Sequence, residues 1–172
     1  MNRLNFIKNT TLLSAVGLLS PSHFAFGSSS KIIGSNEKIK FGTIGLNNMG
    51  WHDSMRLLRV PNVELVAICD VDKNILEKRD YELKKSGIKV KVFSDYRNLL
   101  EDRDIDAVLI GTPDHWHPMM MIHASETGKH VYCEKPIGNS IGECNAMVKA
   151  QERYGNIVQV GQWQRSMQHF KD

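Results

Sequence analysis

The sequence predicts an α/β fold in which a doubly wound parallel sheet has helices on both faces. Six short apolar segments with the character of strands alternate with segments of helical periodicity, and parallel strands require such crossover connections. A glycine-containing turn follows the first of these segments, and an aspartate ends the second. In an open sheet of this kind the ligand lies outside the carboxyl ends of the strands, where the strand order reverses.

Composition limits the chain to about one ordinary globular domain, with 172 residues of which 41% are hydrophobic and 24% charged. The net charge of +3 is mild, and Lys and Arg are not interleaved with aromatic residues, so we expect no nucleic-acid partner. The three cysteines lie in apolar or helical patterns without a CxxC pair. They are therefore interpreted as small buried side chains rather than a disulfide framework or a metal site.

The first residues have the pattern of an export signal. Arg3 and Lys8 precede an apolar run, 11–19, that is too short to span a bilayer, and 25–27 offers small residues for cleavage. We predict an export signal at 1–27, a polar linker at 28–37, and an exported, periplasmic protein without a stable membrane anchor. Leu4 replaces the second arginine of a twin-arginine pattern, which leaves the export route open, and an amphipathic or disordered tail is the alternative.

The turn between Gly45 and Gly50 is the predicted phosphate-binding element. It follows a strand-like run, 38–44, and precedes a helix whose N-terminal amides would face an anion. In such turns the first glycine allows the sharp bend, and the third allows helix and strand to pack closely. Asn47 takes the place of the middle glycine, and we interpret it as tolerated because Asn adopts positive φ more readily than most residues.

The remaining elements follow from periodicity and from Gly, Pro and capping residues. Apolar residues at helical spacing predict a helix near 51–58, and a capping box formed by Ser140 and Glu143 predicts the start of another. The other predicted helices are 71–86, 95–100 and 118–127, and the later strands are 63–69, 90–93, 106–111, 130–136 and 157–160. We place the folded domain at 38–162 and the start of a further, truncated domain at 163–172.

Polar residues follow five of the predicted strands at the edge where a ligand would bind. They form the candidate site, together with the two glycines of the turn: Asn47, Asn48, Met49, Asp70, Thr112, Pro113, Asp114, His115, Trp116, His117, Glu134, Lys135 and Gln162. The predicted helix faces carry no comparable group. A carboxylate at Asp70 can accept hydrogen bonds from both hydroxyls of an adenosine ribose and would repel a 2′-phosphate, which favours NAD over NADP. The alternative is that Asp70 only caps the following turn.

Two further features of this set concern chemistry. His115 and His117 invite a metal interpretation, but no third ligand accompanies them, so we expect a helix cap or a cofactor contact and no metal. Lys135 ends a predicted buried strand, where a charge is costly unless it is paired with Glu134 or a neighbour, or faces a ligand in a desolvated site. Beside a nicotinamide, its amine could orient a substrate hydroxyl and take part in proton transfer. A purely structural ion pair is the alternative.

These motifs resemble those of the Gfo/Idh/MocA oxidoreductases from about Lys38 to the end of the chain. The resemblance rests on residues 44–50, 68–70, 95–96, 111–117, 134–136 and 158–162. It implies an NAD(P)-binding Rossmann domain, a second domain for sugar or polyol substrates, and a catalytic and nicotinamide-binding role for Lys135. It also implies cofactor contacts at Asn48, Met49, Asp70, Asp114, His115, Trp116, His117, Glu134 and Lys135. We expect the full-length form to be a homo-oligomer.

Two departures from the family pattern leave the function open. Asn47 replaces a glycine, and the chain ends at Asp172, where the second domain should begin, so we expect cofactor binding without substrate turnover. Three hypotheses follow: an NAD(P)-dependent oxidoreductase, an NAD-dependent α-N-acetylgalactosaminidase, and a non-catalytic NAD-binding fragment. In the glycosidase branch a Trp stands where this chain has Asp114, which argues against the second hypothesis without excluding it.

Overall fold

The computed structural model of the chain describes residues 38–167. The predicted export signal at 1–27, the predicted linker at 28–37 and the last residues, 168–172, lie outside the described residues. No helix within 38–167 is both long enough and apolar enough to cross a membrane.

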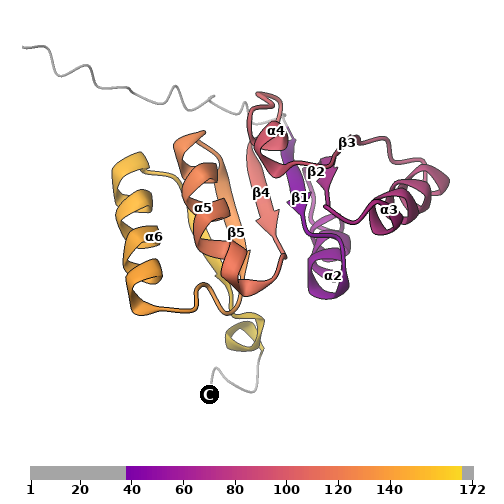
Figure 1. Ribbon diagram of the computed structural model, residues 1–172. Coiled ribbons are helices and arrows are strands. Elements are labelled where there is room, and N and C mark those ends of the chain that lie inside the picture. The colour runs from indigo at the N-terminus through magenta and orange to yellow at the C-terminus, as the bar shows by residue number, and fades with distance from the viewer. Residues whose placement is uncertain (1–37, 168–172) are drawn as a thin grey trace, which may run out of the picture. The chain divides into compact units, whose positions relative to one another are not determined.

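The described residues build one six-stranded sheet in which every strand is parallel to its neighbours (Figure 1). The strand order is β3-β2-β1-β4-β5-β6, so the order reverses between β1 and β4, as the sequence predicts. The strands are β1 (Ile39–Ile44), β2 (Val63–Cys69), β3 (Lys91–Phe93), β4 (Ala107–Ile110), β5 (His130–Glu134) and β6 (Val158–Gly161). The doubly wound parallel sheet is therefore confirmed.

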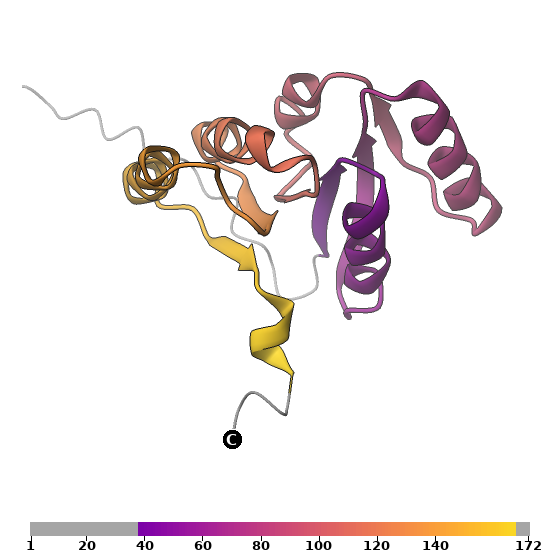
Figure 2. The ribbon, with the colours of Figure 1, turned by 60° about the horizontal axis from the view of Figure 1, so that its bottom comes forward.

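Helices cover both faces of this sheet (Figure 2). They are α2 (Asn48–Leu57), α3 (Lys73–Lys85), α4 (Tyr96–Leu100), α5 (His117–Glu126) and α6 (Ile141–Tyr154), with short 3₁₀ helices η1 (Asp114–Trp116) and η2 (Trp163–Ser166). The predicted capping box is present at α6, where the Glu143 amide donates to the Ser140 hydroxyl at 3.2 Å. Beyond the last strand, the chain forms only the short turn η2 before the described residues end.

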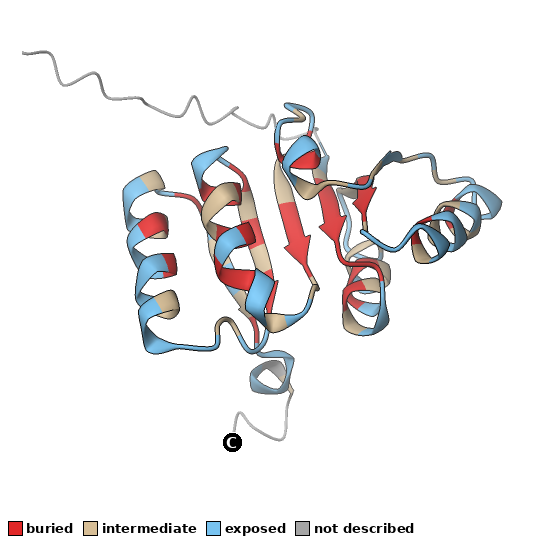
Figure 3. Cartoon of the chain, viewed as in Figure 1, coloured by how far each residue is buried: buried red, intermediate tan, exposed pale blue. Residues whose placement is uncertain are grey.

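The apolar side chains form one cluster on each face of the sheet. Helices α4, α5 and α6 supply Leu99, Met121 and Met147 to one cluster, while α3 supplies Leu76 and Leu83 to the other. Figure 3 shows the buried residues along the strands and on the helix faces turned toward them. The central strand β4 is covered on both faces, and its sequence is accordingly a continuous apolar run.

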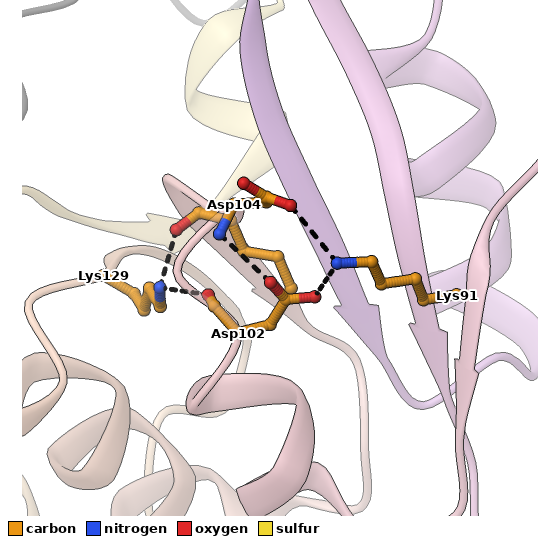
Figure 4. Close-up of polar contacts among 5 residues, drawn as sticks. Lys91, Asp102, Asp104 and Lys129 are labelled. Atoms are coloured by element: carbon orange, nitrogen blue, oxygen red, sulfur yellow. Dashed lines mark hydrogen bonds and ion pairs between the residues drawn. The ribbon is translucent and has the colours of Figure 1, made fainter.

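A buried lysine joins the strands at the edge opposite the predicted site (Figure 4). Lys129 is 6% exposed, and its ammonium donates to the carbonyl oxygens of Asp102 and Ile105 at 2.6 and 2.7 Å. On the surface of the same loop, Lys91 pairs with the carboxylates of Asp102 and Asp104 at 2.7 and 3.3 Å. Burial lowers the pKa of Lys129, although the neighbouring aspartates oppose this shift. The contacts fix the loop before β4 against the starts of β3 and β5.

Replacing Lys129 with Met should destabilise the fold by about 2–4 kcal/mol, because the carbonyl oxygens of Asp102 and Ile105 would lose the hydrogen bonds that the ammonium donates. Urea unfolding measures this loss. The matched control is Lys149→Met on the exposed face of α6, which should change the free energy of unfolding by no more than about 0.5 kcal/mol. Equal effects of the two substitutions would contradict a structural role for the buried ammonium.

Candidate functional site

The turn after β1 is closed by backbone contacts that leave no space for side chains. Gly45 has a φ of +89°, and a Cβ on Gly45 would lie 2.8 Å from the backbone of Gly111. A Cβ on Gly50 would lie 2.1 Å from the carbonyl oxygen of Gly45. The sharp bend and the close packing predicted for this turn are therefore present. The sequence did not single out Gly111, whose own Cβ would lie 2.4 Å from the Cα of Gly50.

Asn47 acts differently from the sequence interpretation. Its φ is −101°, and its side-chain oxygen accepts from the Asn48 amide at 3.0 Å as the N-cap of α2. The positive φ belongs instead to Asn48, at 39°. The proposal that Asn47 substitutes for glycine by adopting positive φ is wrong, because an N-cap residue takes an extended backbone. Both side chains are exposed at the N-terminus of α2, whose first-turn amides are suited to an anion.

Asp70 ties the end of β2 to this turn. One carboxylate oxygen accepts from the amide of Leu46 at 2.8 Å, and the other accepts from the amide of Asp72 at 3.0 Å. The side chain therefore caps the following turn, as the structural alternative proposed. Each carboxylate oxygen retains acceptor capacity, and the residue is half-buried at the cavity wall. The two interpretations of Asp70 are thus compatible.

A cavity of about 350 Å³ lies beside the point where the strand order reverses. Its wall contains Gly45, Asp70, Thr112, Pro113 and Trp116, five residues of the predicted site. The turn between β3 and α4 and the first residues of α4 add to the wall residues that the candidate set omitted: Ser94, Asp95, Tyr96 and Arg97. These follow the end of the third strand, so the carboxyl-end rule could have included them. Arg97 is turned toward Asp95, with which it forms an ion pair at 2.8 Å.

The turn after β4 separates its two histidines. His115 is exposed, whereas His117 is 1% exposed and its two ring nitrogens lie 2.7 Å from the carbonyl oxygens of Pro136 and Thr112. His117 thus connects the turn after β4 to the turn after β5, and a direct cofactor contact by its ring stays a prediction. Within residues 38–167, no cluster of three or more His, Cys, Asp or Glu side chains could hold a metal ion.

The turn after β5 corrects the expectation for Lys135. The strand ends at Glu134, so Lys135 lies beyond it and is exposed, and among the described residues its ammonium has no ion-pair partner. The predicted burial or pairing with Glu134 is therefore wrong. Lys135 lines a second hollow, of about 270 Å³, together with Gln162 and Trp163.

Glu134 is the charged group that is buried here, with 4% of its surface exposed. Burial, the charge of Asp53 and a hydrogen bond with Asp53 raise the pKa of Glu134. Burial and the neighbouring carboxyl groups of Glu134 and Asp53 raise the pKa of Tyr132 to about 12. Asp53 was absent from the predicted site, because its place in the sequence is the middle of a helix rather than the end of a strand.

Residues 39–162 match the family described as "Oxidoreductase family, NAD-binding Rossmann fold", Gfo/Idh/MocA. The chain belongs to this family. The family is NAD-binding and its fold is the Rossmann fold, in agreement with the sequence prediction.

The similar proteins include inositol dehydrogenases and a protein assigned to a glycosyl hydrolase family. An inositol 2-dehydrogenase from Salmonella typhimurium is 30% identical over 72% of this chain and 36% of its own length. A glycosyl hydrolase family 109 protein from Shewanella baltica is 32% identical over 81% of this chain and 29% of its own length. The structure of scyllo-inositol dehydrogenase from Lactobacillus casei with bound NAD(H) and scyllo-inositol gives a TM-score of 0.71 at 28% identity, over 78% of this chain and 39% of that one. The chain thus spans about a third of the length of these proteins.

The geometry of the site fits a dinucleotide. The contacts among Gly45, Gly50 and Gly111 pack the N-terminus of α2 directly against the two glycines that line the cavity, as the close approach of a pyrophosphate to such a turn requires. Asp70 stands at the cavity wall where an adenosine ribose would bind, with Leu46 and Asp72 fixing its orientation. The residues present would therefore hold the phosphates at the turn and the ribose at the end of β2.

The charge of Asp70 should set the preference for NAD over NADP. Asp70→Asn preserves the shape of the side chain and one acceptor oxygen but removes the charge that repels a 2′-phosphate. The dissociation constant of NADP divided by that of NAD should therefore fall by about fivefold or more. Titration of both dinucleotides against the unaltered chain and the variant measures this ratio. Asp72→Asn, the N-cap of α3, is the matched control and should leave the ratio unchanged. Tighter binding of NADP by the unaltered chain would refute the assignment.

Proposed function

We propose that this chain is the cofactor-binding part of an NAD(P)-dependent oxidoreductase that acts on a sugar, polyol or related carbohydrate by hydride transfer. The observation that carries the proposal is the exposed Lys135 amine at the carboxyl end of β5, in a hollow shared with Gln162 and on the same sheet edge as the cavity. The inositol dehydrogenases similar to this chain support a polyol substrate.

The chain's own residues would divide the work along the sheet edge. Bound NAD would supply the hydride acceptor. The turn from Gly45 to Gly50 and Asp70 would fix the dinucleotide at β1 and β2, two strands and more away from Lys135. The Lys135 side chain would hydrogen-bond a substrate hydroxyl and take part in the transfer of its proton as hydride leaves the carbon that bears this hydroxyl. An exposed position suits this role, because the amine must reach a substrate rather than a protein carboxylate.

A second candidate function is an NAD-dependent glycosidase of the α-N-acetylgalactosaminidase type. The observation in its favour is the 32% identity with the glycosyl hydrolase family 109 protein, over most of this chain. Asp114 argues against this candidate. It is half-buried at the start of η1, and its carboxylate accepts from the His115 amide at 2.8 Å, at the position where the glycosidase branch has an aromatic side chain.

We also propose that the protein is exported and cleaved near Gly27. The basic residues before the apolar run and the small residues after it support this proposal. A folded-protein export route would allow the enzyme to carry its cofactor out of the cytoplasm already bound. N-terminal sequencing of the protein from fractionated cells tests this, and Met1 retained in a cytosolic form would refute it.

The protein that the gene encodes should reduce NAD to NADH as it oxidises cyclic polyols or sugars. The Lys135→Met substitution should slow this turnover by about 10²–10⁴-fold. The dissociation constant for NAD should change by no more than a few-fold, because the phosphates would bind at the turn after β1, whereas Lys135 follows β5. Lys149→Met on α6 is the control and should leave both quantities unchanged. Release of the aglycone from an aryl N-acetylgalactosaminide without net NADH would favour the glycosidase instead, and an unchanged rate in Lys135→Met would remove Lys135 from the mechanism.

A further inference from the structure

A pair of opposite charges lies at the cavity wall beside Asp70. The end of β2 runs next to the end of β3, since Cys69 pairs with Phe93 in the sheet register and the Asp70 amide donates to the Phe93 carbonyl oxygen at 3.4 Å. Asp95 and Arg97 come shortly after Phe93, and both line the same cavity as Asp70. The place where an adenosine ribose would bind therefore has an arginine nearby as well as an aspartate.

The Asp95 carboxylate occupies the donor groups of the Arg97 guanidinium. The Nε atom donates to both carboxylate oxygens, at 3.0 and 3.2 Å, and Nη2 donates to Oδ2 at 2.8 Å. The same edge of a guanidinium is the one that binds a phosphate through two parallel hydrogen bonds. Because the pair carries no net charge, Asp70 supplies the remaining charge among the described residues that line the cavity.

The segment that carries this pair is fixed at both sides of Tyr96. Asp95 is the N-cap of α4, and its Oδ1 atom accepts from the backbone amide of Arg97 at 2.9 Å. The Tyr96 hydroxyl lies 2.9 Å from the Nδ1 atom of His123 on α5, and the two rings are stacked. The guanidinium therefore extends from a fixed point at the cavity wall.

We propose that Asp95 is a second determinant of the preference for NAD, because it engages the Arg97 guanidinium that would otherwise bind the 2′-phosphate of NADP. An arginine near the ribose acid is the group that accommodates this phosphate in Rossmann folds that bind NADP. Here 67% of the Arg97 side chain is exposed, so a ligand can reach it, but the carboxylate holds its donors. Asp70 repels the phosphate, whereas Asp95 withholds the cation that would attract it.

This inference rests on the cofactor-binding part of the proposed function and is independent of the reaction at Lys135. It also separates two roles of Asp95 that the structure combines. The N-cap requires an oxygen atom, which Asn or Ser also supplies, whereas the ion pair requires a negative charge. A neutral capping residue at this position therefore releases Arg97 while it keeps the start of α4.

The test is a calorimetric titration of the protein that the gene encodes with adenosine 2′,5′-bisphosphate and with adenosine 5′-monophosphate. These two probes differ only in the 2′-phosphate, and neither contains a nicotinamide. In Asp95→Asn the dissociation constant of the bisphosphate should fall by about three- to tenfold, because a free guanidinium then faces the phosphate. The dissociation constant of the monophosphate should change by less than about twofold.

A second substitution identifies the group that is responsible. In the double variant Asp95→Asn with Arg97→Gln, the dissociation constant of the bisphosphate should return to within about twofold of its value in the unaltered protein. If the double variant keeps the tighter binding, the lost charge of Asp95 explains it without Arg97, and the proposal is overturned. Asp104→Asn, which removes one carboxylate from the ion pair with Lys91 at the opposite sheet edge, is the control and should leave both constants unchanged.

Unchanged binding of both probes by Asp95→Asn would show that the ion pair only supports the start of α4, and would overturn the inference. If Asp95→Asn does not fold, Asp95→Ser keeps a capping oxygen and provides the same test.

Titration of the unaltered protein with NAD separates this inference from the proposed function. A protein that binds NAD but shows no gain in the variant contradicts the inference alone. The gain in a protein that oxidises no polyol or sugar supports the inference and contradicts the oxidoreductase function. Failure to bind NAD and both probes would overturn the two together.

Discussion

The contact of three backbones at Gly45, Gly50 and Gly111 is the constraint on which the site depends. These glycines bring the end of β1, the start of α2 and the end of β4 closer together than any side chain would allow. The contact lies where the strand order reverses, which is also where the sheet edge opens. The helix N-terminus and the cavity are therefore adjacent because of packing, before any ligand is considered.

The polar residues around this contact stabilise its geometry as well as offering groups to a ligand. Asp70 accepts from Leu46 in the turn and from Asp72 beyond β2, and Arg79 of α3 donates to the Leu46 carbonyl oxygen at 3.2 Å. His117 similarly connects the turns after β4 and β5 through two carbonyl oxygens. Such bonds fix loop backbones that would otherwise be free to move, so a ligand meets groups that are already oriented.

The sequence predicts the parts of this structure that depend on local pattern. The parallel strand order, the capping box at Ser140 and the close packing at Gly50 all follow from periodicity or from the chemistry of single residues. Asn47 was misinterpreted because it was expected to adopt the positive φ of the glycine that it replaces in the motif. In the structure this residue is the N-cap of α2, which requires an extended backbone. Lys135 was misplaced because the apolar run that precedes it does not show at which residue the strand ends.

The burial of Glu134 lies beyond any such pattern, since it depends on which strand lies beside β5. Gly161 of β6 pairs with Glu134 in the sheet register, and a Cβ on Gly161 would lie 2.1 Å from the Glu134 Oε1 atom. The Tyr132 hydroxyl donates to Oε1 at 3.3 Å, and the Lys135 amide donates to Oε2 at 3.3 Å. Because these contacts hold the Glu134 carboxyl group, they also fix the start of the turn that carries Lys135. The position of Lys135 therefore depends on β6 as well as on the strand that precedes it.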